Sequence, residues 1–227
     1  MFYSGPVSSG YQMDETSVEE LEAEREVYGP FTQAIRALVD VAIRTTASAD
    51  EVRLAQAGIE EITARLQAGG LTGPYGVRFR TDGASRAWGN AVIGLRNAVA
   101  PPLVIAKDDR GVHSEFHLGA AYEGPPGSVH GGVLSLVLDQ MLGQAAGAGG
   151  KPGMTATLTL TYRKRTPLGD LSCRAWIERT EGHKTWARGE LCGPDGVTVE
   201  AEGLFILPKW AREQMTARDG PSPRFFE

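Results

Sequence analysis

One segment of the 227-residue chain limits the possible folds more than any other. Residues 133–146 read VLSLVLDQMLGQAA, and apolar side chains occur on nearly every side of the helix that this segment would form. A helix that is apolar all round is a buried helix, because a solvent-facing helix keeps a polar side. We therefore expect the rest of the chain to enclose a helix over residues 133–146.

The residues around this helix are patterned as β-strands separated by short turns that contain Gly, Pro or Asp. The candidates are residues 103–107, 112–118, 155–162, 171–179, 185–192 and 197–207. Strict alternation over 155–162 predicts a half-buried strand. Because nothing else in the chain could cover the helix on all sides, we expect a curved antiparallel sheet to wrap it, in an α+β fold.

The first 95 or so residues are patterned as helices. Residues 14–26 contain seven acidic side chains and one arginine, and Thr16 with Glu19 fits a capping box at a helix start. Gly29-Pro30 interrupts the pattern, so a second helix is expected from Phe31.

A third helix is expected to begin at Ser48 or Asp50 and to end at Gly69-Gly70. Its apolar face would carry Val52, Leu54, Ile59, Ile62 and Leu66. The helices could act as a lid or an oligomerisation element, or simply dock on the sheet domain. Residues 71–102 predict a long connection with one short strand near 91–95.

Composition excludes several classes of protein. A net charge of −5 argues against a general nucleic-acid binder, and no apolar run is long enough for a transmembrane helix. Residues 1–13 lack the features of a signal peptide, and two cysteines are too few for a disulfide framework, so a cytoplasmic location is expected. Cys173 and Cys192 are expected to be small strand residues. Glycine is in excess, with 29 residues, mostly at turns and at the helix end near 143–153.

The predicted central helix begins at His130-Gly131-Gly132 and carries one charged residue, Asp139, nine positions after the histidine. A carboxylate in an apolar run costs on the order of several kcal/mol unless it is partnered or functional. It could cap a loop or pair with an arginine, or it could be a general base or nucleophile at a cleft. The free backbone N–H groups of Gly131 and Gly132 at the helix N-terminus would suit an oxyanion hole.

Val129-His130-Gly131-Gly132 followed by Asp139 resembles the hotdog-fold thioesterase superfamily, and more narrowly the PaaI-like and THEM4-like acyl-CoA thioesterases. The resemblance covers about residues 97–207 and includes the strand after Asp139 that contains Thr155. It implies a hotdog fold, a long central helix wrapped by a curved antiparallel sheet, with an N-terminal helical extension. The expected division is extension and linker over 1–96, hotdog domain over 97–210 and a tail over 211–227.

The resemblance also assigns roles. Asp139 matches the catalytic acidic residue, Gly131 the residue whose amide polarises the thioester carbonyl, and Thr155 a position that orients the water or the acid. The active site is expected at the interface of a homodimer or dimer of dimers, with Asp139 and the His-Gly-Gly turn from different subunits. Several relatives place an asparagine six residues before the histidine, where this chain has Gly124.

Other residues could serve the substrate. His130 could contact the thioester or brace the turn. Coenzyme A needs cations for its phosphates, and Arg163, Lys164, Arg165 and Lys184 could supply them, or they could be solvated strand ends. No further cofactor is expected. His113 and His117 would share a strand face, but without a third ligand they do not predict a metal site.

The sequence therefore predicts an acyl-CoA thioesterase, a hydrolase that releases free acid and CoA. A non-catalytic hotdog module that binds acyl-CoA as a sensor or carrier is the alternative. A hotdog hydratase would need a histidine after an aspartate within the central helix, and residues 133–146 contain none.

Overall fold

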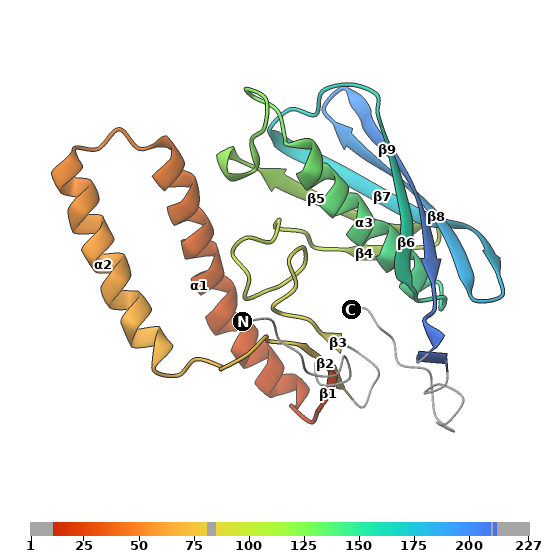
Figure 1. Ribbon diagram of the computed structural model, residues 1–227, viewed down its shortest axis with the longest axis horizontal. Coiled ribbons are helices and arrows are strands. Elements are labelled where there is room, and N and C mark those ends of the chain that lie inside the picture. The colour runs from red at the N-terminus through yellow and green to blue at the C-terminus, as the bar shows by residue number, and fades with distance from the viewer. Residues whose placement is uncertain (1–10, 81–84, 210, 213–227) are drawn as a thin grey trace.

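The computed structural model describes residues 11–80, 85–209 and 211–212. Its centre is the helix α3 (Gly131–Ala148), which lies across one face of a six-stranded antiparallel sheet (Figure 1). The strands follow the order β4-β5-β7-β8-β9-β6. Their bounds are β4 Ala106–Asp108, β5 Gly111–Leu118, β6 Met154–Tyr162, β7 Gly169–Glu181, β8 Lys184–Gly193 and β9 Gly196–Ile206. The predicted α+β class and the antiparallel sheet are confirmed. Helix α3 is buried where it faces the sheet, but Leu136 is 39% exposed, so the sheet of one chain does not cover the helix on all sides.

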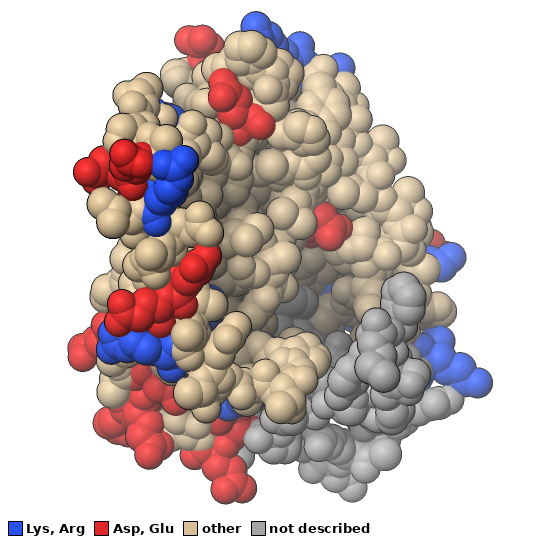
Figure 2. Space-filling model, turned by 60° about the vertical axis from the view of Figure 1, so that its left-hand side comes forward, with Lys and Arg blue, Asp and Glu red and all other residues tan. Residues whose placement is uncertain are grey.

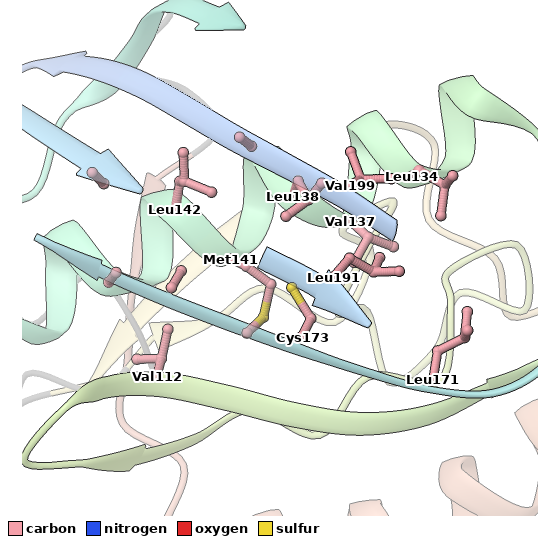
Figure 3. Packing of buried hydrophobic residues seen from close by; sticks show 14 of the residues in the cluster. Val112, Leu134, Val137, Leu138, Met141, Leu142, Leu171, Cys173, Leu191 and Val199 are labelled. Atoms are coloured by element: carbon pink, nitrogen blue, oxygen red, sulfur yellow. The ribbon is translucent and has the colours of Figure 1, made fainter. Parts of the chain in front are cut away.

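Close packing of α3 on the sheet forms the core. Figure 3 shows Leu138, Met141 and Leu142 of the helix lying among side chains from the strands. Leu142 is fully buried, and a Cβ atom on Gly189 of β8 or Gly203 of β9 would lie within 2.8 or 2.9 Å of its methyl groups. The two glycines thus leave the space that Leu142 fills, which brings the helix close to the strands.

Strand β6 occupies one edge of the sheet and pairs only with β9 among the described strands. It is exposed over most of its length, and only Leu158 and Leu160 pack partly against the core. The expectation of a half-buried strand is therefore wrong for the single chain. An edge strand has no neighbour on one side, so its second set of backbone groups is open.

The first two helices predicted for the N-terminal extension form one continuous helix. Helix α1 (Val18–Arg44) runs through Pro30, and its capping box joins Ser17 and Glu20, one position after the expected pair. Tertiary contacts hold the helix on both sides of the proline. Leu21 is buried before it, and after it Arg36 donates to the carbonyls of Asn97 and Ala100.

Helix α2 (Ala49–Gln67) begins after the Ser48 N-cap, as predicted. All of its residues are exposed, including its whole predicted apolar face. Only α1 docks on the sheet domain: Asp40 of that helix accepts the Ala120 N–H at the short 3-10 helix η2 (Ala120–Tyr122). Hence the docked-extension reading is confirmed for α1 and wrong for α2.

A second, small sheet joins the start of the extension to the connection. It consists of β1 (Tyr11–Asp14), β2 (Val77–Arg80) and β3 (Ser85–Arg86). The buried guanidinium of Arg86 pairs with Asp14 and with Glu24 of α1, at 2.9 Å each. Neither this sheet nor the ion-pair group was predicted.

The strand expected near 91–95 is wrong, because this segment forms turns. The side-chain oxygen of Asn90 accepts the N–H groups of Val92 and Ile93, at 2.7 and 3.1 Å. Local side-chain hydrogen bonds of this kind compete with strand pairing. Residues 1–10 and most of the predicted tail at 211–227 lie outside the described residues. Within the described ranges, no helix is both long and apolar enough to cross a membrane.

Removal of the Leu142 side chain tests the packing of α3. We expect Leu142→Ala to lower the free energy of unfolding by about 2–5 kcal/mol, because the strand glycines cannot fill the cavity. Leu54→Ala on α2, where the side chain is 68% exposed, is the matched control and should change it by less than about 0.5 kcal/mol. Urea unfolding measures both, and equal effects would contradict the described packing.

Candidate active site

The one acidic residue of α3 meets a hydroxyl from the edge strand. Asp139 is half-buried, and its Oδ1 accepts a hydrogen bond of 2.8 Å from the Thr155 hydroxyl of β6. The structure therefore brings together the two polar residues that the sequence had placed sixteen positions apart. No arginine or lysine pairs with Asp139 within the described part of the chain.

An irregularity in β6 aims Thr155 at the helix. Leu158 and Leu160 face the core, and strict alternation would send Thr155 to the opposite face. The pairing of β6 with β9 shifts register between Thr155 and Thr157. A bulge of this kind resets the alternation, and bulges are frequent beside functional sites, where they re-aim a side chain.

The N-terminus of α3 is braced by His130. This residue is the N-cap, and its Nδ1 accepts the Gly132 N–H at 3.0 Å. Nδ1 is thus the unprotonated ring nitrogen in this arrangement. The Gly131 N–H has no hydrogen-bond partner among the described residues and remains available to a ligand. Of the two amides expected to form an oxyanion hole, the Gly132 amide is engaged within the chain.

Two further hydroxyls hold this turn, and the sequence analysis missed both. The Gly131 carbonyl accepts hydrogen bonds from Tyr162 of β6 at 2.9 Å and from Ser135 of α3 at 3.0 Å. The two hydroxyl oxygens also lie 3.0 Å apart. Tyr162 shares the alternation of Leu158 and Leu160, so that periodicity was the available signal that its side chain faces the helix.

Gly124 lies against the same turn. A Cβ atom at this position would come within 2.7 Å of the His130 Cα and 3.0 Å of its Cβ. A side chain such as asparagine therefore does not fit here without movement of the His130 backbone. Glycine at position 124 thus permits the close approach of the His130 backbone.

Asp139 and the Gly131 amide lie at different places along α3. They are eight residues apart, which corresponds to about 12 Å along the helix axis at 1.5 Å per residue. Groups that act on the same reacting atoms must come within about 3–3.5 Å of them. One copy of the chain therefore does not bring Asp139 and Gly131 to a single carbonyl group.

The basic residues separate into two places. Arg165 lies beside the turn before α3, where it donates to the Ser128 hydroxyl at 3.0 Å and the Pro126 carbonyl at 2.7 Å. Arg163 pairs with Glu200 at 2.7 Å, which raises the pKa of its guanidinium. Lys164 donates to the Asp195 carbonyl at 2.5 Å. Lys184 lies at the other end of the sheet, where β8 pairs with Ile206, so it does not join the other three.

The remaining histidines and the cysteines lie elsewhere in the sheet. His113 and His117 of β5 pair with Asp108 at 3.4 Å and Asp170 at 2.7 Å. Cys173 and Cys192 are free and lie within β7 and β8, as expected for small strand residues. Burial raises the pKa of the Cys173 thiol well above its usual range, which keeps it protonated and unreactive.

Comparison with known proteins assigns the fold family. A family model described as the thioesterase superfamily matches residues 126–200, which include α3, β6, β7 and β8. A crystal structure described as a thioesterase superfamily protein is 32% identical, with a TM-score of 0.69 over 86% of this chain and 93% of that chain. This chain belongs to the thioesterase superfamily. Its sheet and central helix form the hotdog fold of that superfamily, with the helical extension added.

Curated members of the superfamily are also similar to this chain. The acyl-coenzyme A thioesterase THEM4 of Xenopus laevis is 34% identical over 105 residues, and that of Mus musculus is 34% identical over 96 residues. These matches cover 44% and 41% of this chain, and 46% and 41% of those proteins. The chain thus aligns with less than half the length of these curated relatives.

The capping role of His130 can be measured apart from any activity. We expect His130→Ala to lower the free energy of unfolding by about 0.5–2 kcal/mol, the usual cost of a lost N-cap acceptor. His130→Asn restores an acceptor and should recover most of that loss. Thermal and urea unfolding check both variants. If the alanine and asparagine variants are equally stable, the side chain does not brace the helix.

Proposed function

We propose that this thioesterase superfamily member hydrolyses acyl-CoA thioesters to a free acid and CoA. The observation that carries the proposal is the Asp139 carboxylate, held by the Thr155 hydroxyl on an otherwise apolar helix beside an open strand edge. A carboxylate and a free amide at a helix N-terminus together suit acyl transfer to water. The similarity to the curated THEM4 thioesterases supports acyl-CoA as the substrate class.

In the proposed reaction, Asp139 acts as general base or as nucleophile. As a base, it takes a proton from water while the water oxygen attacks the thioester carbon. As a nucleophile, it forms an acyl-carboxylate anhydride that water then hydrolyses. In both routes the carbonyl oxygen becomes an oxyanion, and the carbon–sulfur bond then breaks to release CoA. The Thr155 hydroxyl orients the carboxylate.

The Gly131 amide is the proposed oxyanion donor, because it has no partner among the described residues and lies at the positive end of the α3 dipole. The Gly132 amide could contribute only after it leaves His130 Nδ1. We assign Arg165 and its neighbours Arg163 and Lys164 to the CoA phosphates, because they flank the turn that bears Gly131. Lys184 is too far along the sheet to join them.

The proposed active site is completed by a second copy of the chain. The separation of about 12 Å between Asp139 and Gly131 requires that the two groups acting on one thioester come from different subunits. Strand β6 lies beside both positions, with Thr155 at Asp139 and Tyr162 at Gly131, and its outer edge is open. Each chain thus carries two half-sites, one at Asp139 and one at Gly131. Antiparallel pairing of β6 with β6 of a second copy would bring the Asp139 half-site of one subunit to the Gly131 half-site of the other.

A lysine on the open edge tests this pairing, because edge lysines oppose strand addition. We expect Thr159→Lys to shift the protein from dimer to monomer and to reduce thioester hydrolysis with it. The control is Thr180→Lys, an exposed threonine on the interior strand β7, which should remain dimeric. Sedimentation velocity over a concentration series measures both. A Thr159→Lys variant that remains a fully active dimer would contradict pairing through β6.

Neutralising Asp139 tests the chemistry. We expect Asp139→Asn to lower the rate of CoA release by about 100-fold or more, since a general base contributes about that much. Thr155→Val should give a smaller loss, and Asp109→Asn, at an exposed turn, should match the wild type. A thiol reagent reports free CoA across acyl-CoA substrates from C2 to C18 and aryl thioesters.

Two outcomes would contradict the hydrolase proposal. Full activity of a folded Asp139→Asn variant would remove the carboxylate from the mechanism. Tight acyl-CoA binding by the wild type without turnover of any substrate would instead favour the non-catalytic binding module.

A further inference from the structure

A cavity of about 1000 Å³ lies between the N-terminal extension and the sheet domain. The first two thirds of α1 (residues 18–36), the connection at 86–107, β5 and the C-terminal end of α3 contribute its walls. Figure 2 views the molecule with the helical extension turned forward and shows the surface hollowed between that extension and the rest of the chain. This cavity has no part in the function proposed above.

The cavity and the candidate active site lie on different sides of α3. Gln144 and Gly147 line the cavity, whereas Asp139 faces β6. Five residues separate Asp139 from Gln144, which corresponds to a rotation of about 140° around the helix axis. Neither Asp139 nor Thr155 is among the described residues that line the cavity.

More of the cavity wall is apolar than polar. Its apolar residues come from α1, the connection and β5, among them Leu21, Trp88, Leu95, Leu103, Ile105 and Val112. Trp88 and Val112 are 5% and 2% exposed, so the cavity reaches well below the surface of the domain. A space of this size and lining suits a ligand with an extended apolar part.

The charged residues of the lining are mostly cations. Arg25, Arg36, Arg86 and Lys107 line the cavity together with a single acid, Glu22. Arg25 pairs with Glu22 at 3.6 Å, and the charge of Arg86 is offset by two carboxylates outside the lining.

Arg36 and Lys107 differ from the other two cations, because they meet only neutral groups within the described residues. Arg36 donates to the carbonyls of Asn97 and Ala100, and Lys107 donates to the Ala148 carbonyl at 2.6 Å. Neither cation has an ion-pair partner among the described residues, in a chain whose net charge is −5. Lys107 is exposed to solvent, and its ammonium group favours an anionic group on the ligand.

Gln144 provides an independent indication of a ligand. Its residue surface is only 6% exposed, and it lines the cavity without a side-chain hydrogen bond to another described residue. Its amide atoms are not among the fully buried unpartnered atoms, so water or a ligand in the cavity can reach them. Buried polar side chains are nearly always hydrogen-bonded, to protein, water or a ligand. A polar group in the cavity would satisfy this amide.

We propose that the cavity is a binding site for a fatty acid, an aliphatic monocarboxylate. The apolar part of the wall holds the alkyl chain, and the carboxylate is bound by Lys107 at the C-terminal end of α3, where Gln144 lies one turn before Ala148. An uncharged lipid would leave Lys107 without an anionic partner, and a nucleotide would place polar groups against Trp88 and Leu103. The proposal does not depend on the hydrolase reaction, because binding is measured without turnover.

Titration of the full-length protein with fatty acids of 8 to 16 carbons, followed by calorimetry, tests the site. The primary alcohols of the same chain lengths serve as the uncharged comparison. We expect the acids to bind about tenfold or more tightly than the alcohols, as the loss of a charge-assisted interaction predicts. Equal affinity of acids and alcohols would overturn the assignment of Lys107 to the carboxylate.

Variants locate the site. Lys107→Glu should weaken acid binding about tenfold or more, whereas Arg110→Glu makes the same change of charge three residues away, outside the lining, and should leave it unchanged. Gln144→Leu, which keeps the side-chain volume, should also weaken the binding. Thermal unfolding confirms that each variant is folded.

Asp139→Asn separates this site from the candidate active site. We expect the variant to bind fatty acid as the wild type does, even if it has lost the proposed hydrolase activity. Acid binding that is lost in Asp139→Asn and retained in Lys107→Glu would place the acid in the active site and overturn the proposal. No acid binding by the wild type at any chain length would also overturn it, and would leave the proposed hydrolase reaction unaffected.

Discussion

Leu142 of α3 fills the space that Gly189 and Gly203 leave open on the adjacent strands β8 and β9. The functional groups of α3 depend on this contact, because it sets the depth at which the helix lies on the sheet. With the helix at that depth, Asp139 reaches β6 at the edge, and Gln144 turns toward the extension. A helix that packs closely against a sheet has few alternative packings, since core side chains interlock at high density.

The hydrogen bond between Thr155 and Asp139 depends on an irregularity in the side-chain alternation of strand β6. A regular β6 could not direct Leu158, Leu160 and Thr155 to the same face. The register shift between Thr155 and Thr157 makes this possible and leaves a carboxylate with a hydroxyl partner at an open edge. The same strand then reaches the Gly131 carbonyl through Tyr162 at the other end of the site. Thus β6 is at once the support of both half-sites and the surface on which a second copy would pair.

The N-terminal extension adds a second region of chemistry to the hotdog fold. Helix α1 is tied to the sheet domain by Arg36 and Asp40, and to the small sheet by the ion pairs of Arg86. These polar contacts hold α1 away from the C-terminal end of α3, and the cavity lies between them. Figure 1 shows α2 standing outside this arrangement, which agrees with the exposure of all its residues.

The sequence alone determined the features that depend on local pattern. The apolar run at 133–146 predicted the buried helix, and the turn residues predicted four consecutive strands, because hydrophobic periodicity and turn chemistry are properties of neighbouring residues. The position of Asp139 in that run identified the central candidate residue. Predictions from local pattern were wrong where contacts between distant segments dominate. Helix α1 continues through Pro30 because residues on both sides of the proline are docked.

Only the tertiary structure decided how the candidate residues meet. The capping of Gly132 by His130, the contact of Tyr162 with Gly131 and the separation of Lys184 from Arg165 depend on the packing of β6, β8 and α3. The cavity and the cations that line it likewise bring together residues of α1, β4 and α3. Arg36 of α1 and Gln144 of α3, for example, are more than 100 residues apart in the sequence. No local pattern encodes such contacts, because their energies arise between segments that become neighbours only when the chain folds.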